Sequence, residues 1–395
     1  MPWGAVSAMD LRSEFCHLAS REGANIRLLC RRFDVSAKTA YKWLARWRER
    51  GAAGMAEMSR RPATSPRRTK PELEAAVLAV RRAHPAWGGR KILAVLRREG
   101  HAAPAASTIT EILRRHGCEI GTFGGGAQTW QRFEHERPND LWQMDFKGHV
   151  PMRNGARLHP LTVLDDHSRY CIALAGCTNQ KTVTVQDVLI GAFRRYGLPQ
   201  TLITDNGSPW GDGPGSPFTP LGVFLIDQGI RIAHARPYHP QTMGKDERFH
   251  RSLKAEALSG PPFDTLDVAQ QKLGEWRAVY NAKRPHEGIG MAVPADRYSP
   301  STRSYCETIE TFDYAPDDIV RRVQHGGRLS LYGRPARVPK AFKGRDVALR
   351  PTETDGVFDV YYRHQPIARL DFTSQPGNGQ TVTHVSEHPL PMCPV

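Results

Sequence analysis

The sequence lacks long apolar runs and any paired pattern of cysteines. No stretch of about 18 apolar residues occurs, so we expect no helix that spans a membrane. The seven cysteines are odd in number and show no Cys-x-x-Cys spacing, which argues against a disulfide framework and against a zinc finger. The opening residues are too weakly apolar for a secretory signal, and Met9 is an alternative start. These absences predict a protein of a reducing cytoplasm.

Acidic residues are scarce in the N-terminal third of the chain, and the net charge of the whole chain is +15. Residues 1–116 contain 23 Lys and Arg against 10 Asp and Glu, whereas residues 117–395 contain 32 against 30. This concentration of positive charge favours a polyanionic partner, because each Lys or Arg placed on a phosphate releases counterions. A generally basic surface that keeps the protein soluble is the alternative.

Residues 10–58 are predicted to form a helix-turn-helix DNA-binding domain. Apolar residues recur at helical spacing over about 10–20 and 25–32, and Ser36 is a good N-cap for a third helix. In this motif the last helix enters the major groove of DNA. The outward residues of that helix, which we expect to contact DNA, are Lys38, Thr39, Tyr41, Lys42 and Arg46. A three-helix bundle with a solvated basic face is the alternative.

A second helix-turn-helix-like DNA-binding domain is predicted over residues 71–116, with Ser107 as the N-cap of its last helix. The segment between the two domains is rich in Pro, Ser and Arg, and we expect its Arg60 and Arg61 to follow the DNA backbone. Residues 117–139 are predicted to be a linker. Their three consecutive glycines form no nucleotide-binding loop, because no Lys-Ser or Lys-Thr pair follows them.

Residues 140–300 are balanced in charge and alternate between strand-like and helix-like segments. The order is β-β-β-α-β-α-β-α, which predicts an α/β domain with a mixed sheet covered by helices. The expected elements are strands at 141–146, 158–164, 170–175, 201–204 and 230–233, and helices at 182–196, at 221–228 and from about 244.

Three acidic residues of this segment are candidate metal ligands because of where they lie. Asp145 lies in an otherwise apolar strand, where a carboxylate is costly unless it is paired or binds a metal. Asp205 ends a strand, and Glu247 lies in the first turns of a helix. Carboxylate oxygens are the ligands that magnesium and manganese favour. The alternatives are a turn residue for Asp205 and an exposed helix charge for Glu247.

The motifs around these acids resemble those of bacterial insertion-sequence transposases with a retroviral-integrase core. The segments that carry the resemblance are Trp142-x-x-Asp145-Phe146, Val163 to Tyr170, Thr204-Asp205-Asn206-Gly207-Ser208, His239-Pro240-Gln241, Lys245-x-Glu247-Arg248-Phe249-His250, and Tyr280-Asn281 through Arg284-Pro285-His286. The resemblance implies a ribonuclease-H-like α/β catalytic core. It also implies an Asp-Asp-Glu triad of Asp145, Asp205 and Glu247 that binds two Mg²⁺ ions, with Mn²⁺ as a substitute.

The resemblance further implies an activity. Members of this family hydrolyse a phosphodiester at the end of a transposon, and the freed 3′-hydroxyl then attacks a second phosphodiester. The partners would be double-stranded DNA of the terminal repeats and the target. A homodimer or larger oligomer would assemble on that DNA, and the protein would be cytoplasmic and associated with the bacterial nucleoid.

Two departures from the family pattern concern the second and third acids. The gap from Asp205 to Glu247 is longer than usual, and the loop 209–215 is expected to absorb the excess. Asp246 precedes Glu247, and on a helix the two point about 100° apart. We choose Glu247 for its match to the motif and for the basic residues near it, although helical geometry leaves both open. The basic residues of this helix expected to hold DNA phosphate are Lys245, Arg248, Arg251 and Lys254.

Residues 315–375 read as short strands and turns, which predicts a small C-terminal β-barrel. Between Arg321 and Arg350 there are nine Lys or Arg and one acid, Asp346, so one face of this domain would either follow DNA or be solvated. Two other functions stay open at this point. One is a DNA-binding protein without catalysis, and the other is a nuclease that cuts RNA–DNA hybrids.

Overall fold

The computed structural model describes residues 7–57, 69–118, 134–205, 207–211, 218–234 and 244–373. The chain divides into two compact units, one within Met1–Arg68 and the other within Thr69–Val395. No helix in the described ranges is long and apolar enough to cross a bilayer. Each unit is built around its own apolar clusters.

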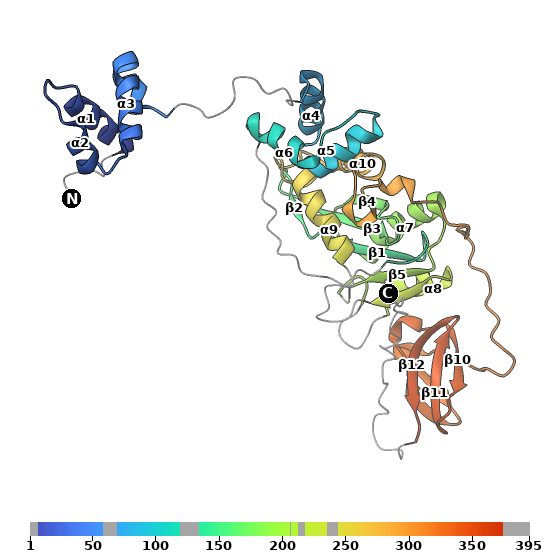
Figure 1. Ribbon diagram of the computed structural model, residues 1–395. Coiled ribbons are helices and arrows are strands. Elements are labelled where there is room, and N and C mark those ends of the chain that lie inside the picture. The colour runs from blue at the N-terminus through green and yellow to red at the C-terminus, as the bar shows by residue number, and fades with distance from the viewer. Residues whose placement is uncertain are drawn as a thin grey trace. The chain divides into compact units, whose positions relative to one another are not determined.

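The described residues of the first unit form three helices and a short 3₁₀ turn, and the three helices are labelled in Figure 1. They are α1 (Ala8–Ala19), α2 (Ile26–Arg32), α3 (Ala37–Arg50) and η1 (Gly51–Met55). Ser36 caps α3 by accepting a hydrogen bond from the amide of Thr39, as the sequence predicts. Trp43 is buried and packs with Phe15 and Leu44, and Trp47 lies partly buried against the same cluster.

The second unit begins with three helices that pack on one another and on the core. They are α4 (Pro71–Ala83), α5 (Gly89–Arg98) and α6 (Ala106–Arg115). The prediction that Ser107 caps the last helix is wrong, because α6 begins at Ala106 after Ala105 and has no side-chain cap. Burial of Ile109 and Ile112 sets where the helix lies, and packing outweighs a cap of about 1 kcal/mol. Arg98 binds Asp296 of the core through two hydrogen bonds.

The core is a mixed sheet, as predicted, in the order β2-β3-β1-β5-β6, with β4 paired to β3. β1 pairs antiparallel with β3 and parallel with β5, and β5 pairs parallel with β6. The strands are β1 (Leu141–Phe146), β2 (Val150–Pro151), β3 (Arg157–Asp165), β4 (Cys171–Cys177), β5 (Thr201–Thr204) and β6 (Arg231–His234). The helices are α7 (Thr182–Tyr196), α8 (Pro220–Asp227), α9 (Gly244–Leu253), the π-helix η3 (Lys254–Leu258) and α10 (Leu266–Ala282). Short 3₁₀ turns η4 (Glu287–Ile289) and η5 (Pro294–Asp296) follow.

Successive side chains of β1 point to opposite faces of the sheet, and the two faces have different neighbours. Trp142 and Met144 belong to the apolar cluster that also holds residues of α7 and α8. Gln143 and Asp145 therefore point to the opposite face, because successive side chains of a strand alternate. Phe249 of α9 lies in the cluster with α10, and Asp246 of the same helix bonds to Gln143. The sheet thus separates an apolar layer from the face that carries the polar residues.

The C-terminal strands form an open sheet rather than the predicted closed barrel. Within the described residues, the sheet order is β12-β11-β10-β7, and the hairpin β8–β9 pairs only with itself. The apolar face packs against Val223 and Ile226 of α8, so a helix of the core covers the side that a barrel would close. The strands are β7 (Ile319–Arg322), β8 (Arg328–Leu331), β9 (Arg334–Arg337), β10 (Asp346–Pro351), β11 (Val357–Tyr362) and β12 (Gln365–Asp371), with 3₁₀ turns η6 (His325–Gly327) and η7 (Lys340–Phe342).

Candidate active site

Asp145 lies near the end of β1, half-buried, with 32% of its side chain exposed. Its carboxylate accepts a hydrogen bond of 2.7 Å from the amide of Phe146. Burial, and to a smaller extent the charge of Asp205, raise the pKa of Asp145 to about 6. A carboxylate with this environment favours a nearby cation, because a cation would offset both effects.

Asp205 directly follows β5, which runs parallel beside β1, so the two acids reach the same edge of the sheet. Its side chain is exposed and accepts a hydrogen bond of 3.0 Å from the amide of Gly207. Trp210 is buried and stacks on Phe146 with 5.6 Å between ring centroids, so the chain after Asp205 is tied to the chain after Asp145. Trp210 lies in the loop 209–215, and the local sequence pattern does not indicate this packing.

Helix α9 brings Asp246, rather than Glu247, against Asp145. Asp246 is 1% exposed, and ligand atoms of Asp145, Asp246 and His250 all lie within 4.8 Å of one another. Burial raises the pKa of Asp246 well above its usual value, and the charge of Asp145 adds to this. Glu247 is exposed on the neighbouring face of the helix. The pattern that could have indicated this is the shared face of Asp246, Phe249 and Leu253, of which the two apolar members are buried.

Thr162 of β3 lies beneath these groups. Its Oγ1 is 2.9 Å from the carbonyl oxygen of Asp145, 3.1 Å from Oδ1 of Asp246 and 2.9 Å from Nε2 of His250. Burial lowers the pKa of His250 to about 3, with a smaller contribution from Lys147, so its imidazole is neutral. The hydroxyl therefore links β1 to two residues of α9, a role that the sequence analysis did not assign to Thr162.

The four basic residues expected on α9 and η3 separate into two groups. Arg248, Arg251 and Lys254 are exposed. Lys245 is only 17% exposed at its side chain, and its Nζ lies 2.5 Å from Oδ2 of Asp166. Burial lowers the pKa of Lys245 to about 8. The structure therefore places Lys245 inside the domain and the other three where a duplex can reach them.

In the first unit, Lys38, Tyr41 and Lys42 are exposed on α3. Thr39 is partly covered and its hydroxyl lies 2.9 Å from that of Ser36. The guanidinium of Arg46 stacks over Trp43, 4.8 Å from the ring centroid. Arg60 and Arg61 lie outside the described residues.

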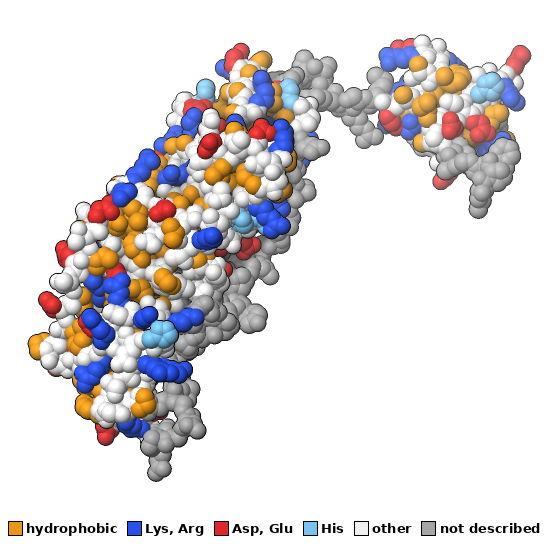
Figure 2. All heavy atoms as spheres, turned by 180° about the vertical axis from the view of Figure 1, so that it is seen from behind, with side chains coloured by type: hydrophobic (Ala, Val, Ile, Leu, Met, Phe, Trp, Pro, Cys, Tyr) orange, Lys and Arg blue, Asp and Glu red, His pale blue; other side chains and the backbone are white. Residues whose placement is uncertain are grey.

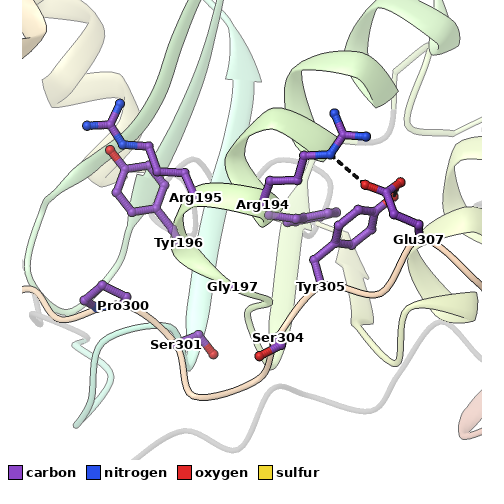
Figure 3. A pocket seen from close by; sticks show the side chains of 10 residues that line it. Arg194, Arg195, Tyr196, Gly197, Pro300, Ser301, Ser304, Tyr305 and Glu307 are labelled. Carbon is purple, nitrogen blue, oxygen red and sulfur yellow. Dashed lines mark hydrogen bonds and ion pairs between the residues drawn. The ribbon is translucent and has the colours of Figure 1, made fainter.

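Among the described residues, the acids differ in exposure: Asp205 and Glu247 are exposed, Asp145 is half-buried and Asp246 is buried. A cavity of about 290 Å³ lies elsewhere, between the end of α7 and residues 300–307, and Figure 3 shows Arg194 and Glu307 paired at its rim. Asp145, Asp205, Asp246 and Glu247 do not line that cavity. The exposure of Asp205 leaves its carboxylate accessible to a large substrate.

The donor set fits a divalent cation. Hard cations prefer carboxylate oxygens, and Asp145 and Asp205 supply them from adjacent strands. Among the described residues, Oδ2 of Asp246 is buried and makes no hydrogen bond, although Nε2 of His250 lies 3.3 Å away, and such an unsatisfied buried oxygen calls for a partner such as a cation. Acidic residues of α9 would supply the remaining ligands of the cation.

Comparison with known families matches most parts of the chain. Two integrase core domain models match residues 135–240 and 228–294. A model of the C-terminal domain of IS481 family transposases matches residues 318–378. Homeodomain-like models match residues 17–56 and 39–113.

Relatives are found among proteins of bacterial insertion elements. The chain is 31% identical over 163 residues to the uncharacterized 39.2 kDa protein of IS476 from Xanthomonas euvesicatoria, covering 40% of this chain and 44% of that protein. It is 26% identical over 236 residues to the uncharacterized 31.7 kDa protein of IS407 from Burkholderia multivorans, covering 58% and 82%. It is 24% identical over 169 residues to the transposase of IS904 from Lactococcus lactis, covering 42% and 64%.

Among solved structures, the intasome of simian T-cell lymphotropic virus in complex with a PP2A regulatory subunit matches at 15% identity and a TM-score of 0.39, covering 72% of this chain and 91% of the matched chain. The residues and the family models lead to the same assignment as the motifs. The chain is similar to proteins of bacterial insertion elements, and integrase core domain models match residues 135–240 and 228–294.

Proposed function

We propose that this chain is a DNA transposase that cuts the ends of its own insertion element and joins them to a target. The observation that carries the proposal is the proximity of Asp145 and Asp205 at the ends of adjacent parallel strands, with Asp246 of α9 beside Asp145. In the reaction, water attacks a phosphodiester at the end of the element and releases a 3′-hydroxyl. That hydroxyl then attacks a phosphodiester of the target, and the bond between the phosphorus and its former 3′-oxygen breaks.

Asp145, Asp205 and Glu247 are the ligands we propose for two Mg²⁺ ions, with Mn²⁺ as a substitute. When bound, such ions activate the attacking oxygen and stabilise the leaving oxygen of a phosphodiester. Glu247 is preferred to Asp246 because it is exposed, as Asp205 is, whereas Asp246 lies where a substrate phosphate cannot approach. The protein's own part is to hold the carboxylates in place.

The DNA-binding parts in this proposal are residues 10–58, residues 71–116 and the exposed basic residues of α9 and η3. Residues 117–139 would link them to a core at 140–300, and a β-rich domain would occupy 315–375. On the face seen in Figure 2, Lys and Arg side chains are spread among acidic and hydrophobic ones. Double-stranded DNA would therefore contact several separate basic sites. Because two DNA ends must be processed, we propose that a homodimer or larger assembly forms on the DNA. We also propose that the protein is cytoplasmic and associated with the nucleoid.

The test uses purified full-length protein and a labelled duplex that carries the DNA flanking its own gene. Mg²⁺ is compared with EDTA, and the wild type with Asp145→Asn. Mg²⁺-dependent nicking and joined products that the variant cannot form are the expected result. Normal strand transfer by Asp145→Asn would overturn the proposal, and binding without cleavage under any metal would indicate a DNA-binding protein. Cleavage of RNA–DNA hybrids but not of duplex DNA would indicate a nuclease of the ribonuclease-H type.

A further inference from the structure

Three polar residues meet inside the core at the start of α9: Gln143 of β1, Asp166 of the turn after β3, and Lys245 of α9. Gln143 is 2% exposed and Asp166 is 0% exposed. Nε2 of Gln143 donates to Oδ1 of Asp166 at 2.8 Å, and Nζ of Lys245 lies 2.5 Å from Oδ2 of Asp166. We call these three residues the α9 anchor.

Lys245 stands at an unfavourable place for a cation. It is the second residue of α9, and the N-terminal end of a helix carries partial positive charge. It is also largely buried, so it loses hydration. The carboxylate of Asp166 offsets both effects. Asp166 is itself held by Gln143 and by the amide of His135 at 3.0 Å, so Lys245 binds a group that cannot move freely.

Gln143 connects Asp166 and Lys245 to β1, the strand that carries Asp145. It lies two residues before Asp145, so both side chains point to the same face of β1. Its Oε1 accepts a hydrogen bond of 3.3 Å from the amide of Asp246, one of the helix N–H groups that has no partner within the helix. A single side chain of β1 therefore bonds to the backbone of α9 and to the residue that holds Lys245.

We propose that the α9 anchor sets the rotation of α9 about its axis and so positions Glu247 relative to Asp145. Each residue of a helix is rotated about 100° from the next. Holding the side chain of residue 245 and the amide of residue 246 therefore determines where residue 247 points. Gln143, Asp166 and Lys245 are positioning residues, since none contacts the reacting atoms. The inference rests on the proposed function only for its effect on catalysis.

The test combines hydrogen exchange of α9 with nicking of duplex DNA. Three full-length variants are compared with the wild type: Lys245→Met, Asp166→Asn, and the double variant, which removes both charges and so leaves neither one buried alone. The matched control is Glu275→Gln, which removes one partner of an exposed ion pair with Lys272 on α10. Exchange is measured by mass spectrometry on peptides that cover residues 244–253, and DNA binding is measured separately.

The expected result is faster exchange in the α9 peptide of the double variant, with the peptides of β1, β5 and α10 unchanged. Nicking should fall on the order of 10- to 100-fold, with DNA affinity retained, because small displacements of catalytic groups have effects of this size. The control should match the wild type in both measurements. Unchanged α9 exchange, or altered exchange with full nicking activity, would overturn the inference. If the wild type does not nick DNA, the proposed function fails, and the exchange data still decide whether the anchor holds α9.

Discussion

Asp246 and Glu247 are adjacent acids with different surroundings. Asp246 faces Thr162 and Asp145 in the interior, whereas Glu247 is exposed. The difference follows from helical rotation, since the face of Asp246 also carries the buried Phe249. Two residues of the same chemistry therefore receive different roles from packing alone.

Substitution of each acid by its amide should separate these roles. Glu247→Gln is expected to reduce Mg²⁺-dependent nicking by about 100-fold or more, because an amide is a poor ligand for a hard cation. Asp246→Asn keeps the shape and can still accept a bond from Thr162, so a loss within about tenfold is expected. Single-turnover nicking at saturating Mg²⁺ measures both. The opposite order would assign the third ligand to Asp246.

The raised pKa of Asp145 predicts a cost to stability in the absence of metal. The carboxyl titrates at about 6 in the folded chain against 3.8 in the unfolded one, so its ionisation opposes folding as the pH rises through this window. At about 1.4 kcal/mol per pH unit, discounted for partial exposure, Asp145→Asn should raise the free energy of unfolding by about 1–2 kcal/mol at pH 7.

Denaturant unfolding in EDTA at pH 7 and at pH 3.5 measures this effect. The gain should be much smaller at the lower pH, where the carboxyl is protonated in the folded state and mostly protonated in the unfolded one. A variant that is less stable than the wild type at pH 7 would contradict the expected environment of Asp145.

At the scale of elements, α8 joins the core to the C-terminal sheet. Asp227 at its end is buried and binds Arg363 at 3.0 Å, Arg345 at 3.1 Å and the hydroxyl of Tyr362 at 2.6 Å. The same helix contributes Val223 and Ile226 to the apolar cluster of the C-terminal strands. The C-terminal sheet is therefore part of the structure that holds α8, the helix that follows the Asp205 segment in the chain.

Asp227→Asn is expected to lower the free energy of unfolding by about 3 kcal/mol, because it leaves the guanidinium of Arg363 largely buried without its countercharge. Urea unfolding followed by tryptophan fluorescence measures the loss. Asp359→Asn is the control, since it removes an exposed pair with Arg369 and should cost at most about 1 kcal/mol. Equal losses of unfolding free energy in the two variants would show that the burial of Asp227 does not add to stability.

At the scale of the whole molecule, the distribution of charge along the chain is the feature most closely related to DNA binding. Most of the excess positive charge lies in residues 1–116. Part of it serves the fold instead, since Arg98 binds Asp296 of the core and Arg115 binds the buried Glu74. Exposed residues of α3 such as Lys38 and Lys42 are better placed to meet phosphate.

Replacing Lys38 and Lys42 together with Ala should weaken binding to duplex DNA and make it less dependent on salt. Each lost phosphate contact lowers the slope of log K against log salt concentration by about 0.9, so a reduction of about two is expected. Fluorescence anisotropy titrations between low and high salt measure the slope. Lys272→Ala on α10 is the control, and a slope that falls equally in the control would argue against contacts by α3.

Local sequence patterns located many of the secondary-structure elements, although not α10. Hydrophobic periodicity located the helices of residues 8–50 and the strands at 141–146 and 201–204, and Ser36 was recognised as a cap. The same patterns placed Asp145 near the end of one strand and Asp205 just after another, whereas the parallel pairing of these two strands is seen only in the structure. The motifs also identified the integrase core.

Only the tertiary structure decided which acid of α9 faces β1, that Lys245 is an internal partner of Asp166, and that α8 covers the C-terminal sheet. Each of these depends on groups far apart in the chain. Gln143, Thr162 and Asp166 supply hydrogen bonds that make burial of polar residues on α9 favourable. A local pattern places polar residues on the solvent side of a helix by default, because it contains no information about the distant partners that offset their desolvation.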